Sequence, residues 1–376
     1  MSTSSQSRRR LAFVVPGDLS TPTGGYGYDR RVIDELRARA WHVDVLGIGD
    51  GFAFPGHAQR QAAMAALRGI PRGRPTVVDG LALGVLPEAR ALAWRAPLVA
   101  LVHQPLASDP ALDAVQAARF LESERTALSG CHRVIATSGA TANLLIETYD
   151  VPPERISIVR PGTDRAAPSP GSVGNAVELL SVGSVVPVKG YEVLIAALGT
   201  LRDLPWRLTI AGDRTRDPVT AAQLDAAIVA RGLGQRVRVL GAVPNTAVHE
   251  LYGASDLFVL ASRFEGYGMA LAEAISHGLP IVSTRAGAIP DTVPGGAGLL
   301  VPPDDAGALA DALRRLIADT RARRELAAGA RDAALRLPTW SDAGRLFADA
   351  IEHAARTHHF GRRDAEETGA VVLPPE

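Results

Sequence analysis

Short apolar runs that alternate with helical patterns constrain the fold of this chain more than any other feature of its sequence. The runs in the first half are rich in Val, Ile and Leu, and they are predicted as buried strands: Leu11–Val15, Val43–Leu46, Pro75–Asp79, Pro97–Val102, Val134–Thr137 and Ile156–Val159. The helical patterns between them cover Tyr28–Ala38, Ala111–Gly130 and Ala140–Tyr149. Strands that alternate with helices form parallel sheets, which helices cover on both faces.

The second half of the chain repeats this scheme. Its predicted strands lie near Glu178–Ser181, Arg207–Ala211, Val237–Leu240, Leu257–Leu260, Pro280–Ser283 and Gly298–Val301. Its predicted helices lie near Gly190–Leu201, Thr220–Arg231, Tyr267–Gly278 and Ala306–Ala318, and from Arg321 to Arg356 the pattern is almost entirely helical. The expected fold class is therefore α/β, with two Rossmann-like domains that each contain an open parallel sheet.

Chain length and one central segment indicate where the two domains divide. A chain of 376 residues exceeds one ordinary hydrophobic core, and the stretch from Pro161 to Asn175 has the Pro, Gly and Ser content of a hinge linker. We expect domains over residues 1–165 and 166–340. Residues 341–376 are expected to hold a helix and then, after His358, a polar disordered tail.

Composition excludes several classes of function. Lys plus Arg and Asp plus Glu both number 40, so no charge excess favours a nucleic-acid partner. Cys131 is the only cysteine, which excludes an intramolecular disulfide and a cysteine-rich metal site, and we expect it to be buried. The first apolar run ends at Pro16, too early for a signal peptide, and no apolar stretch approaches the roughly 20 residues of a membrane helix. We therefore expect a cytoplasmic protein.

Ligands of open parallel sheets bind at the carboxyl ends of the strands, so candidate binding and catalytic residues are expected there. Gly24 and Gly25 precede the helix predicted from Tyr28, where paired glycines let backbone approach a phosphate or sugar. A plain turn explains the pair equally well. His103 directly follows the strand Pro97–Val102, so it is either a cleft-lining residue or a structural histidine.

The segment from Gly183 to Gly190 combines a strand end, glycine and proline with the sole lysine of the chain. Lys189 is the one lysine among 40 basic residues, and it stands at the start of a predicted helix. A diphosphate needs amide donors, a helix N-terminus and a cation that reaches its oxygens. The segment lacks the glycine spacing and the following Ser or Thr of a Walker P-loop.

A second segment runs from a strand into an acidic residue, a glycine turn and a helix with another acid. Glu265 precedes the helix and can point at a ligand over its N-terminus, and Glu273 lies about two turns further in. A carboxylate accepts paired hydrogen bonds from vicinal hydroxyls, so sugar or ribose hydroxyls are the expected ligands. Solvated surface charges are the alternative, although apolar neighbours mark this helix as buried. The intervening turn contains Gly266, Tyr267, Gly268 and Met269.

Together these motifs resemble the family 4 glycosyltransferases, which have the two-domain GT-B fold. Glu265 and Glu273 match the family's E-x7-E signature, and the sequence from Ser262 to Val293 is similar to the family nearly throughout. The resemblance extends from Leu11 to Ala354. Other similar segments are Gly24-Gly25, His103, Pro161-Gly162-Thr163-Asp164, Ile210-Ala211-Gly212, Ala254-Ser255-Asp256 and Leu300-Val301-Pro302-Pro303.

The resemblance implies a retaining transfer of a hexosyl group from a nucleoside diphosphate sugar to a lipid, glycan or small-molecule acceptor, as in cell-envelope or polysaccharide biosynthesis. Residues 166–340 would bind the donor, residues 1–165 would face them across a cleft on the acceptor side, and the C-terminal helix would pack back towards the N-terminal domain. Glu273 would hold the ribose diol and Glu265 the sugar hydroxyls, while Lys189 would stabilise the departing diphosphate. The implied catalytic residues are His103, Lys189 and Glu265, and the implied donor-binding residues are Gly24, Gly25, Gly183, Ser184, Lys189, Glu265, Gly266, Tyr267, Gly268, Met269 and Glu273.

One position departs from the family pattern. Many members carry an arginine directly after the glycine at 183, whereas this chain has Ser184. Either Arg214 or Arg285 supplies the second cation, or the site depends more heavily on Lys189. No Asp-x-Asp pair of the kind that chelates a divalent ion for a diphosphate is found, so metal independence and no cofactor beyond the donor are expected.

Two other functions and one surface remain open from the sequence. A sugar-nucleotide epimerase of the same fold would need acid–base carboxylates in the first half, and a binding protein without activity would fit Ser184. Arg30, Arg31 and Arg37 lie close together on a predicted helix. They belong either to a solvated face or to a contact with the inner membrane face or a charged acceptor.

Overall fold

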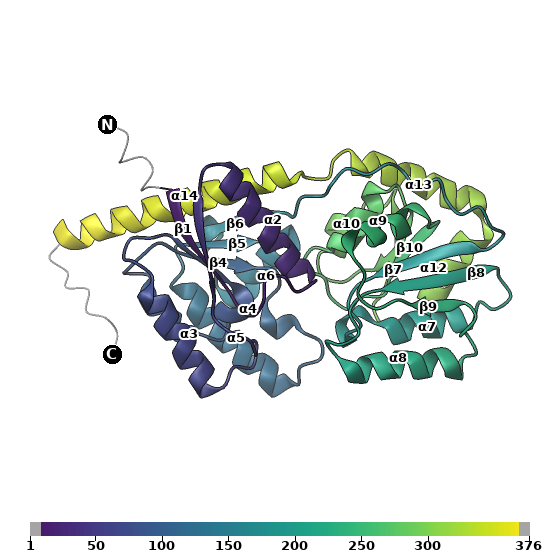
Figure 1. Ribbon diagram of the computed structural model, residues 1–376, viewed down its shortest axis with the longest axis horizontal. Coiled ribbons are helices and arrows are strands. Elements are labelled where there is room, and N and C mark those ends of the chain that lie inside the picture. The colour runs from purple at the N-terminus through teal and green to yellow at the C-terminus, as the bar shows by residue number, and fades with distance from the viewer. Residues whose placement is uncertain (1–8, 368–376) are drawn as a thin grey trace. The chain divides into compact units, whose positions relative to one another are not determined.

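The computed structural model describes residues 9–367, with side chains as far as His359. These residues form two compact units: the chain up to Pro161 together with the chain from Trp340 onward, and the continuous stretch Gly162–Thr339. Each unit contains one six-stranded parallel sheet (Figure 1). The second unit thus starts at Gly162, where the sequence had suggested residue 166, and the C-terminal helix belongs to the first unit.

The sheet of the first unit has the strand order β2-β1-β3-β4-β5-β6, and all of its pairs are parallel. Every residue of its two central strands, β3 and β4, is buried, as expected for strands that helices cover on both faces. Cys131 is buried in this core, as predicted. The strands are β1 (Arg10–Val15), β2 (His42–Gly47), β3 (Thr76–Asp79), β4 (Leu98–Val102), β5 (Arg133–Ala136) and β6 (Ile156–Ile158).

The first helix of this unit begins earlier than the sequence suggested. Thr23 caps it, because its hydroxyl oxygen accepts a hydrogen bond of 3.2 Å from the Tyr26 N–H. Gly24 and Gly25 therefore form the first turn of the helix, where a loop before it was expected. The helices are α2 (Gly24–Ala38), α3 (His57–Gly69), α4 (Gly80–Leu83), α5 (Ala114–Ser129) and α6 (Gly139–Tyr149), with 3-10 turns η2 (Pro87–Leu92), η3 (Leu106–Ser108) and η4 (Pro153–Arg155).

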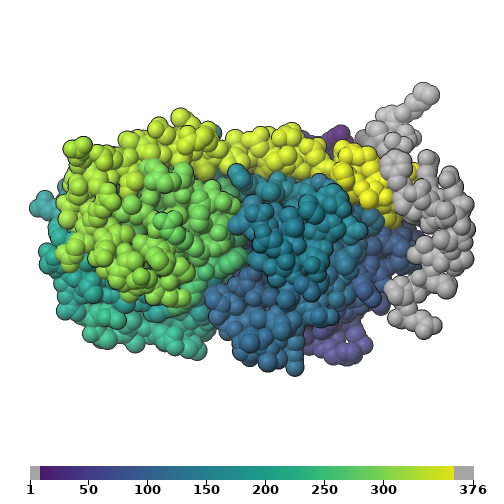
Figure 2. Space-filling model, turned by 180° about the vertical axis from the view of Figure 1, so that it is seen from behind, coloured from purple at the N-terminus to yellow at the C-terminus, as the bar shows by residue number. Residues whose placement is uncertain are grey.

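The long C-terminal helix α14 (Trp340–Glu367), yellow in Figures 1 and 2, returns to the first unit and packs on α2. The Phe347 ring stacks on Phe13 of β1 at 6.1 Å, and both side chains are fully buried. The tail predicted after His358 is helical to Glu367, because Arg, Ala and Glu sustain a helix without apolar periodicity. The rest of that predicted tail, residues 368–376, lies outside the described residues.

The second unit repeats the architecture with the strand order β12-β11-β10-β7-β8-β9. Apolar clusters cover both faces of its sheet, and Trp206 and Tyr252 are among the largest side chains that are fully buried. The strands are β7 (Val177–Val182), β8 (Trp206–Ala211), β9 (Val237–Val239), β10 (Leu257–Leu260), β11 (Ile281–Thr284) and β12 (Gly298–Val301). The helices are α7 (Tyr191–Gly199), α8 (Pro218–Ala230), α9 (Asn245–Gly253), α10 (Met269–Ser276), α11 (Ile289–Thr292), α12 (Ala306–Ala318) and α13 (Thr320–Ala334), with the 3-10 turn η5 (Pro187–Lys189).

Two helical predictions in this half need correction. The helix expected over Tyr267–Gly278 is limited to α10, because Gly268 and Gly278 have positive φ values of 88° and 69° that no right-handed helix contains. The helical pattern from Arg321 to Arg356 is split into α13 and α14, because Pro338 lacks an N–H and disfavours helix at the residue before it. Within residues 9–367, none of the helices combines the length and hydropathy needed to cross a membrane.

Candidate active site

Two of the sequence motifs meet at the carboxyl edge of the second sheet. β7 leads into the segment with Lys189, and its neighbour β10 leads into the segment with Glu265. Lys189 Nζ lies 2.6 Å from Glu265 Oε1, although 76 residues separate the two in sequence. Their side chains are only 20% and 11% exposed, so the ion pair is largely shielded from solvent. The fold therefore places the only lysine of the chain where open α/β sheets bind ligands.

The loop that carries Lys189 is fixed by close backbone packing. Gly190 follows η5 with a φ of 61°, and a Cβ atom there would lie 2.3 Å from the Ala261 carbonyl oxygen. The Tyr191 hydroxyl donates a 2.8 Å hydrogen bond back to the Gly183 carbonyl oxygen. Only glycine fits position 190, because any side chain would collide with the end of β10. The turn consequently holds the lysine against the acidic segment.

Glu265 retains hydrogen-bonding capacity. Its Oε1 accepts from both Lys189 Nζ and Ser262 Oγ, each at 2.6 Å. Its Oε2 has no hydrogen-bond partner in the described part of the chain, while the residue is 9% exposed. An ionised carboxylate can accept about four hydrogen bonds, so Oε2 is available to ligand hydroxyls.

Glu273 lies one turn inside α10, not two as the sequence suggested, because the helix starts only at Met269. The Tyr252 hydroxyl of α9 lies 3.1 Å from Glu273 Oε2. Burial raises the pKa of Glu273 to about 7, with a smaller contribution from Asp164, while the hydrogen bond from Tyr252 acts in the opposite direction. Gly266, Tyr267 and Gly268 form the turn between the two acids.

In the first unit, His103 follows β4 directly and contacts two aspartates. Its Nε2 lies 3.1 Å from Asp29 Oδ1 and 3.6 Å from Asp79 Oδ2, and both carboxylates are almost fully buried. Gly25 lies beside the ring, since a Cβ atom there would be 3.4 Å from His103 Cδ2. Thr137 Oγ1 donates to the His103 carbonyl oxygen at 3.0 Å. The histidine is thus built into the carboxyl edge of this sheet and remains 23% exposed.

The two aspartates keep His103 protonated. Burial alone would lower the pKa of the imidazole, but Asp29 and Asp79 outweigh it and raise this pKa to about 10. Burial raises the pKa of Asp29 to about 7, against the influence of His103. One ligand atom from each of the three residues lies within 4.8 Å of the others, but a protonated histidine has no lone pair to offer a metal ion, so in this charge state the three residues form an ion-pair network.

The sequence analysis missed Asp29, Asp79 and Tyr252. A signal existed for Asp79, which ends β3 beside β4, so the rule that pointed to His103 also applied to it. Asp29 lies inside α2 and Tyr252 inside α9, and both look like ordinary helical residues in the sequence.

The candidates for a second cation near Ser184 differ in the structure. Arg214 forms an ion pair with Asp225 of α8. The Arg285 side chain is exposed, and its backbone N–H donates to the Val301 carbonyl oxygen at 2.8 Å. Arg263 beside the site donates to the Pro187 carbonyl oxygen at 2.5 Å and pairs with Asp304, which ties the acidic segment to η5.

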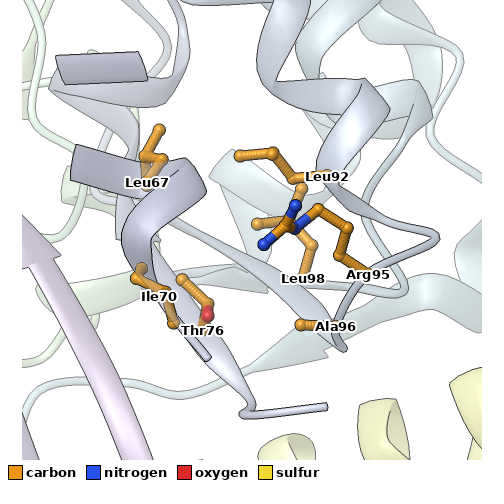
Figure 3. Close-up of a pocket in the computed structure, with 7 residues that line it drawn as sticks. All are labelled: Leu67, Ile70, Thr76, Leu92, Arg95, Ala96 and Leu98. Atoms are coloured by element: carbon orange, nitrogen blue, oxygen red, sulfur yellow. The ribbon is translucent and has the colours of Figure 1, made fainter. Parts of the chain in front are cut away.

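Two hollows of the first unit lie away from these residues. The cavity in Figure 3 is about 20 Å³, roughly room for one water molecule, and it lies beside the amino ends of β3 and β4. A larger hollow of about 680 Å³ is lined by α5, Arg60 of α3 and Pro87 of η2. Neither contains a residue predicted for the site. The residues that line the small cavity are Leu67, Ile70, Thr76, Leu92, Arg95, Ala96 and Leu98.

Two family models match consecutive parts of the chain. The model described as Glycosyltransferase Family 4 matches residues 30–167. The model described as Glycosyl transferases group 1 matches residues 163–333, which include Lys189, Glu265 and Glu273. The boundary between the two matches falls near the division between the two units.

Curated relatives are similar over about two thirds of the chain. A D-inositol 3-phosphate glycosyltransferase from Nocardioides sp. is 30% identical over 69% of this chain and 63% of its own length. An MMP α-(1→4)-mannosyltransferase from Mycolicibacterium hassiacum is 27% identical over 65% of this chain and 62% of its own length. The match therefore covers less than two thirds of these relatives.

Solved structures share the fold. The sucrose-phosphate synthase of Thermosynechococcus elongatus superposes with a TM-score of 0.74 and 21% identity, over 95% of this chain and 99% of that one. Anabaena HepE, solved in complex with UDP and glucose, gives a TM-score of 0.72 and 20% identity, over 91% of this chain and 99% of that one.

Proposed function

Because the chain belongs to the family 4 glycosyltransferases and has their GT-B fold, we propose that it transfers a hexosyl group from a nucleoside diphosphate sugar to a lipid, glycan or small-molecule acceptor. The observation that carries this proposal is the shielded contact between Lys189 and Glu265 at the carboxyl edge of the second sheet, with Glu273 on the following helix. A cation, two acids and a helix N-terminus match the phosphates and hydroxyls of one elongated ligand.

We propose that Lys189 stabilises the departing diphosphate. An ammonium group has three donors, so one can remain with Glu265 while the others reach phosphate oxygens. The amides at Gly268 and Met269 open α10 and would add the positive end of its dipole. Glu265 Oε2 would accept from the hydroxyls of the transferred sugar, and Glu273 from those of the ribose. Charge on the leaving group is then met by fixed protein groups, which is why we propose a reaction without metal or cofactor.

The proposed reaction retains the anomeric configuration. The bond between the anomeric carbon and the diphosphate oxygen breaks, and the acceptor oxygen forms its bond on the same face. The acceptor proton passes to an oxygen of the departing diphosphate. His103, held protonated by Asp29 and Asp79, would donate a hydrogen bond to an oxygen of the bound substrate.

We also propose a cytoplasmic location, and the contacts of three arginines on α2 bear on whether the protein also touches the inner membrane face. The three arginines considered for that contact are engaged within the first unit. Arg31 lies 4.8 Å from the Trp340 ring, while Arg30 and Arg37 donate to the carbonyl oxygens of Thr21 and Val43 at 3.3 and 3.4 Å. Their contacts favour a structural role over a membrane-binding one.

A donor screen tests the proposal. The purified chain is incubated with UDP-, GDP- and ADP-sugars in the presence of EDTA, and binding and slow hydrolysis are measured. We expect one nucleotide to bind and turn over, and Lys189→Ala and Glu273→Ala to lose turnover. Arg321→Ala, on the exposed face of α13, is the control that should behave like the wild type. Binding without turnover across many acceptors would indicate a binding protein, and no binding at all would overturn the proposal.

A further inference from the structure

The buried hydroxyl of Tyr252 lies near two acceptor oxygens but has only one proton to donate. It lies 3.0 Å from the Ala270 carbonyl oxygen and 3.1 Å from Glu273 Oε2. A tyrosine hydroxyl donates one hydrogen bond and can accept others. With Glu273 ionised, the Tyr252 proton can satisfy only one of these two oxygens at a time.

A proton on Glu273 removes this conflict. The protonated carboxyl donates to the tyrosine oxygen, and Tyr252 then donates to Ala270. With the carboxylate ionised, Tyr252 turns its proton to Glu273, and Ala270 keeps the hydrogen bond that a helical carbonyl accepts from the N–H four residues later. The two arrangements use the same atoms, so Tyr252 can serve both charge states of Glu273.

The neighbours of Glu273 favour its neutral form in the empty site. Burial raises the pKa of Glu273 to about 7, the hydrogen bond from Tyr252 acts in the opposite direction, and Asp164, from the segment before β7, adds a smaller increase. From α9, His249 lies 3.2 Å from His277, whose ring stacks on Tyr252. Burial, with a smaller effect of His249, lowers the pKa of His277 to about 4, so His277 is neutral at pH 7.

The other elements packed on α10 bring little charge to this carboxyl. β10 and β11 contain no titratable side chain, and Asp291 of α11 is exposed. The stem of Arg331 from α13 lies against Gly278, beyond the far end of α10. In the part of the chain whose side chains are described, Tyr252 contacts Glu273 at Oε2, which leaves Oε1 able to accept from a ligand hydroxyl.

We propose that Tyr252 is a positioning residue that couples binding of the nucleotide sugar to release of one proton from Glu273. The inference rests on the proposed function, in which Glu273 binds the ribose diol. A diol that lies across the carboxyl donates one O–H to each oxygen, and such hydrogen bonds are about twice as strong to an ionised carboxylate as to a neutral carboxyl, so the ionised form binds the diol more tightly. Binding therefore takes the ionised form, the carboxyl proton passes to the buffer, and Tyr252 reorients its hydroxyl from Ala270 to Glu273.

The sign of the pH dependence follows from this step. Below the pKa of Glu273 the empty site holds a proton that must leave on binding, so donor affinity falls as the pH falls. Above that pKa the affinity is flat. With the pKa of Glu273 raised to about 7, affinity at pH 6 should be about tenfold weaker than at pH 8.

Titration calorimetry with the full chain tests the coupling. UDP-, GDP- and ADP-glucose are the probes, because their phosphates are diesters and do not titrate between pH 6 and 9. Each titration is run in two buffers of different ionisation enthalpy, which gives the number of protons released. We expect nearly one proton at pH 6 and almost none at pH 8.5. Glu273→Gln, which cannot ionise, should lose the proton release that the wild type shows.

Tyr252→Phe separates positioning from simple support of the fold. The ring is kept, but the hydroxyl that stabilises the carboxylate is lost, so the pKa of Glu273 should rise by about one unit. Donor affinity should then fall about tenfold at pH 6 and about twofold at pH 8. A loss that is equal at both pH values would show a structural role and overturn the inference.

Tyr149→Phe is the matched control. The Tyr149 hydroxyl also lies 3.1 Å from a buried glutamate, Glu124, but in the first unit. The Tyr149→Phe variant should release as many protons on donor binding as the wild type. A wild-type chain that binds a donor at pH 6 without releasing a proton would overturn the inference and leave the proposed function standing. A chain that binds no donor at any pH would overturn both.

Discussion

Two glutamates, one in each unit, each contact the hydroxyl of a tyrosine and differ in their remaining contacts. Tyr149 donates to Glu124, and Tyr252 lies against Glu273, each at 3.1 Å. Burial raises the pKa of both carboxyls to about 7. Glu124 also accepts from the N–H groups of Leu106 and Ala107 at 2.7 and 3.2 Å, so both of its oxygens are used. In the described residues, Tyr252 contacts Glu273 at Oε2, so Oε1 can still accept a hydrogen bond. A similarly raised pKa therefore does not imply an equal role.

The same contrast separates the charged groups at the two carboxyl edges. In the first unit, His103 Nε2 is held between Asp29 and Asp79, and the remaining Asp29 oxygen, Oδ2, is buried without a hydrogen-bond partner in the described residues. In the second unit, Lys189 and Glu265 share one contact, and Glu265 Oε2 is left over. Hydrogen-bonding capacity that a ligand can reach marks where contacts can be added, whereas an enclosed network of charged groups mainly fixes the fold.

The largest expected effect is on turnover when Lys189, in the second unit, is replaced. Lys189→Ala should reduce turnover of the donor by about 100-fold or more, because it removes the cation aimed at the departing charge. The thermal midpoint should fall as well, because the substitution removes the cation that pairs with the largely shielded Glu265 carboxylate. Steady-state kinetics and thermal unfolding measure the two quantities, with Lys189→Arg as the charge-conserving variant. Near-normal turnover of the alanine variant would contradict the role of Lys189.

The next largest effect is on stability when Glu124, in the first unit, is replaced. Glu124→Ala removes the buried carboxylate that accepts from two part-buried N–H groups and from Tyr149, so the free energy of unfolding should fall by about 3 kcal/mol. Urea unfolding measures the loss. Glu122→Ala, on the same helix but exposed, should cost little. Equal effects of the two substitutions would mean that Glu124 does not hold the segment after β4.

A smaller effect is expected at His103. Asp29→Asn keeps the shape of the side chain but removes the negative charge 3.1 Å from Nε2, so the pKa of His103 should fall from about 10 by one unit or more. An NMR titration of the imidazole, assigned with a His103→Gln variant, measures the shift. An unchanged pKa would show that Asp79 and other groups alone keep the ring protonated.

The smallest expected effect is on the free energy of unfolding when either of the two tyrosines loses its hydroxyl. Tyr149→Phe and Tyr252→Phe each remove one buried hydroxyl, and each should lower the free energy of unfolding by about 1 kcal/mol at pH 8. Urea unfolding in parallel experiments measures both. A much larger cost for Tyr252→Phe would indicate that its hydroxyl supports α10 rather than adjusts to Glu273.

The strands could be predicted from the sequence because buried parallel strands are apolar on both faces, as β3 and β10 are throughout. Helices were harder. α3 buries only Ala63, Met64 and Leu67, so its periodicity is weak, and the start of α2 depends on the Thr23 cap. The sequence pattern is weak in both places, because α3 buries few apolar residues and the start of α2 is set by a polar cap.

The candidate site was predictable where chemistry coincides with a strand end. Lys189 and Glu265 follow β7 and β10 closely, and sheet order brings those strands together. Asp29 and Tyr252 could not be found in this way, because they lie inside α2 and α9 and not at the end of a strand. Only the packed tertiary structure shows that one supports His103 and the other Glu273.

The return of α14 to the first unit sets an order for synthesis. A ribosome completes the second unit, Gly162–Thr339, while the first still lacks its last helix. Until Trp340 and the residues after it emerge, Phe13 has no Phe347 to cover it, although both end fully buried. A chain that stops before α14 would present that uncovered surface to chaperones and to other chains. The part of the protein translated first is thus the last to be finished.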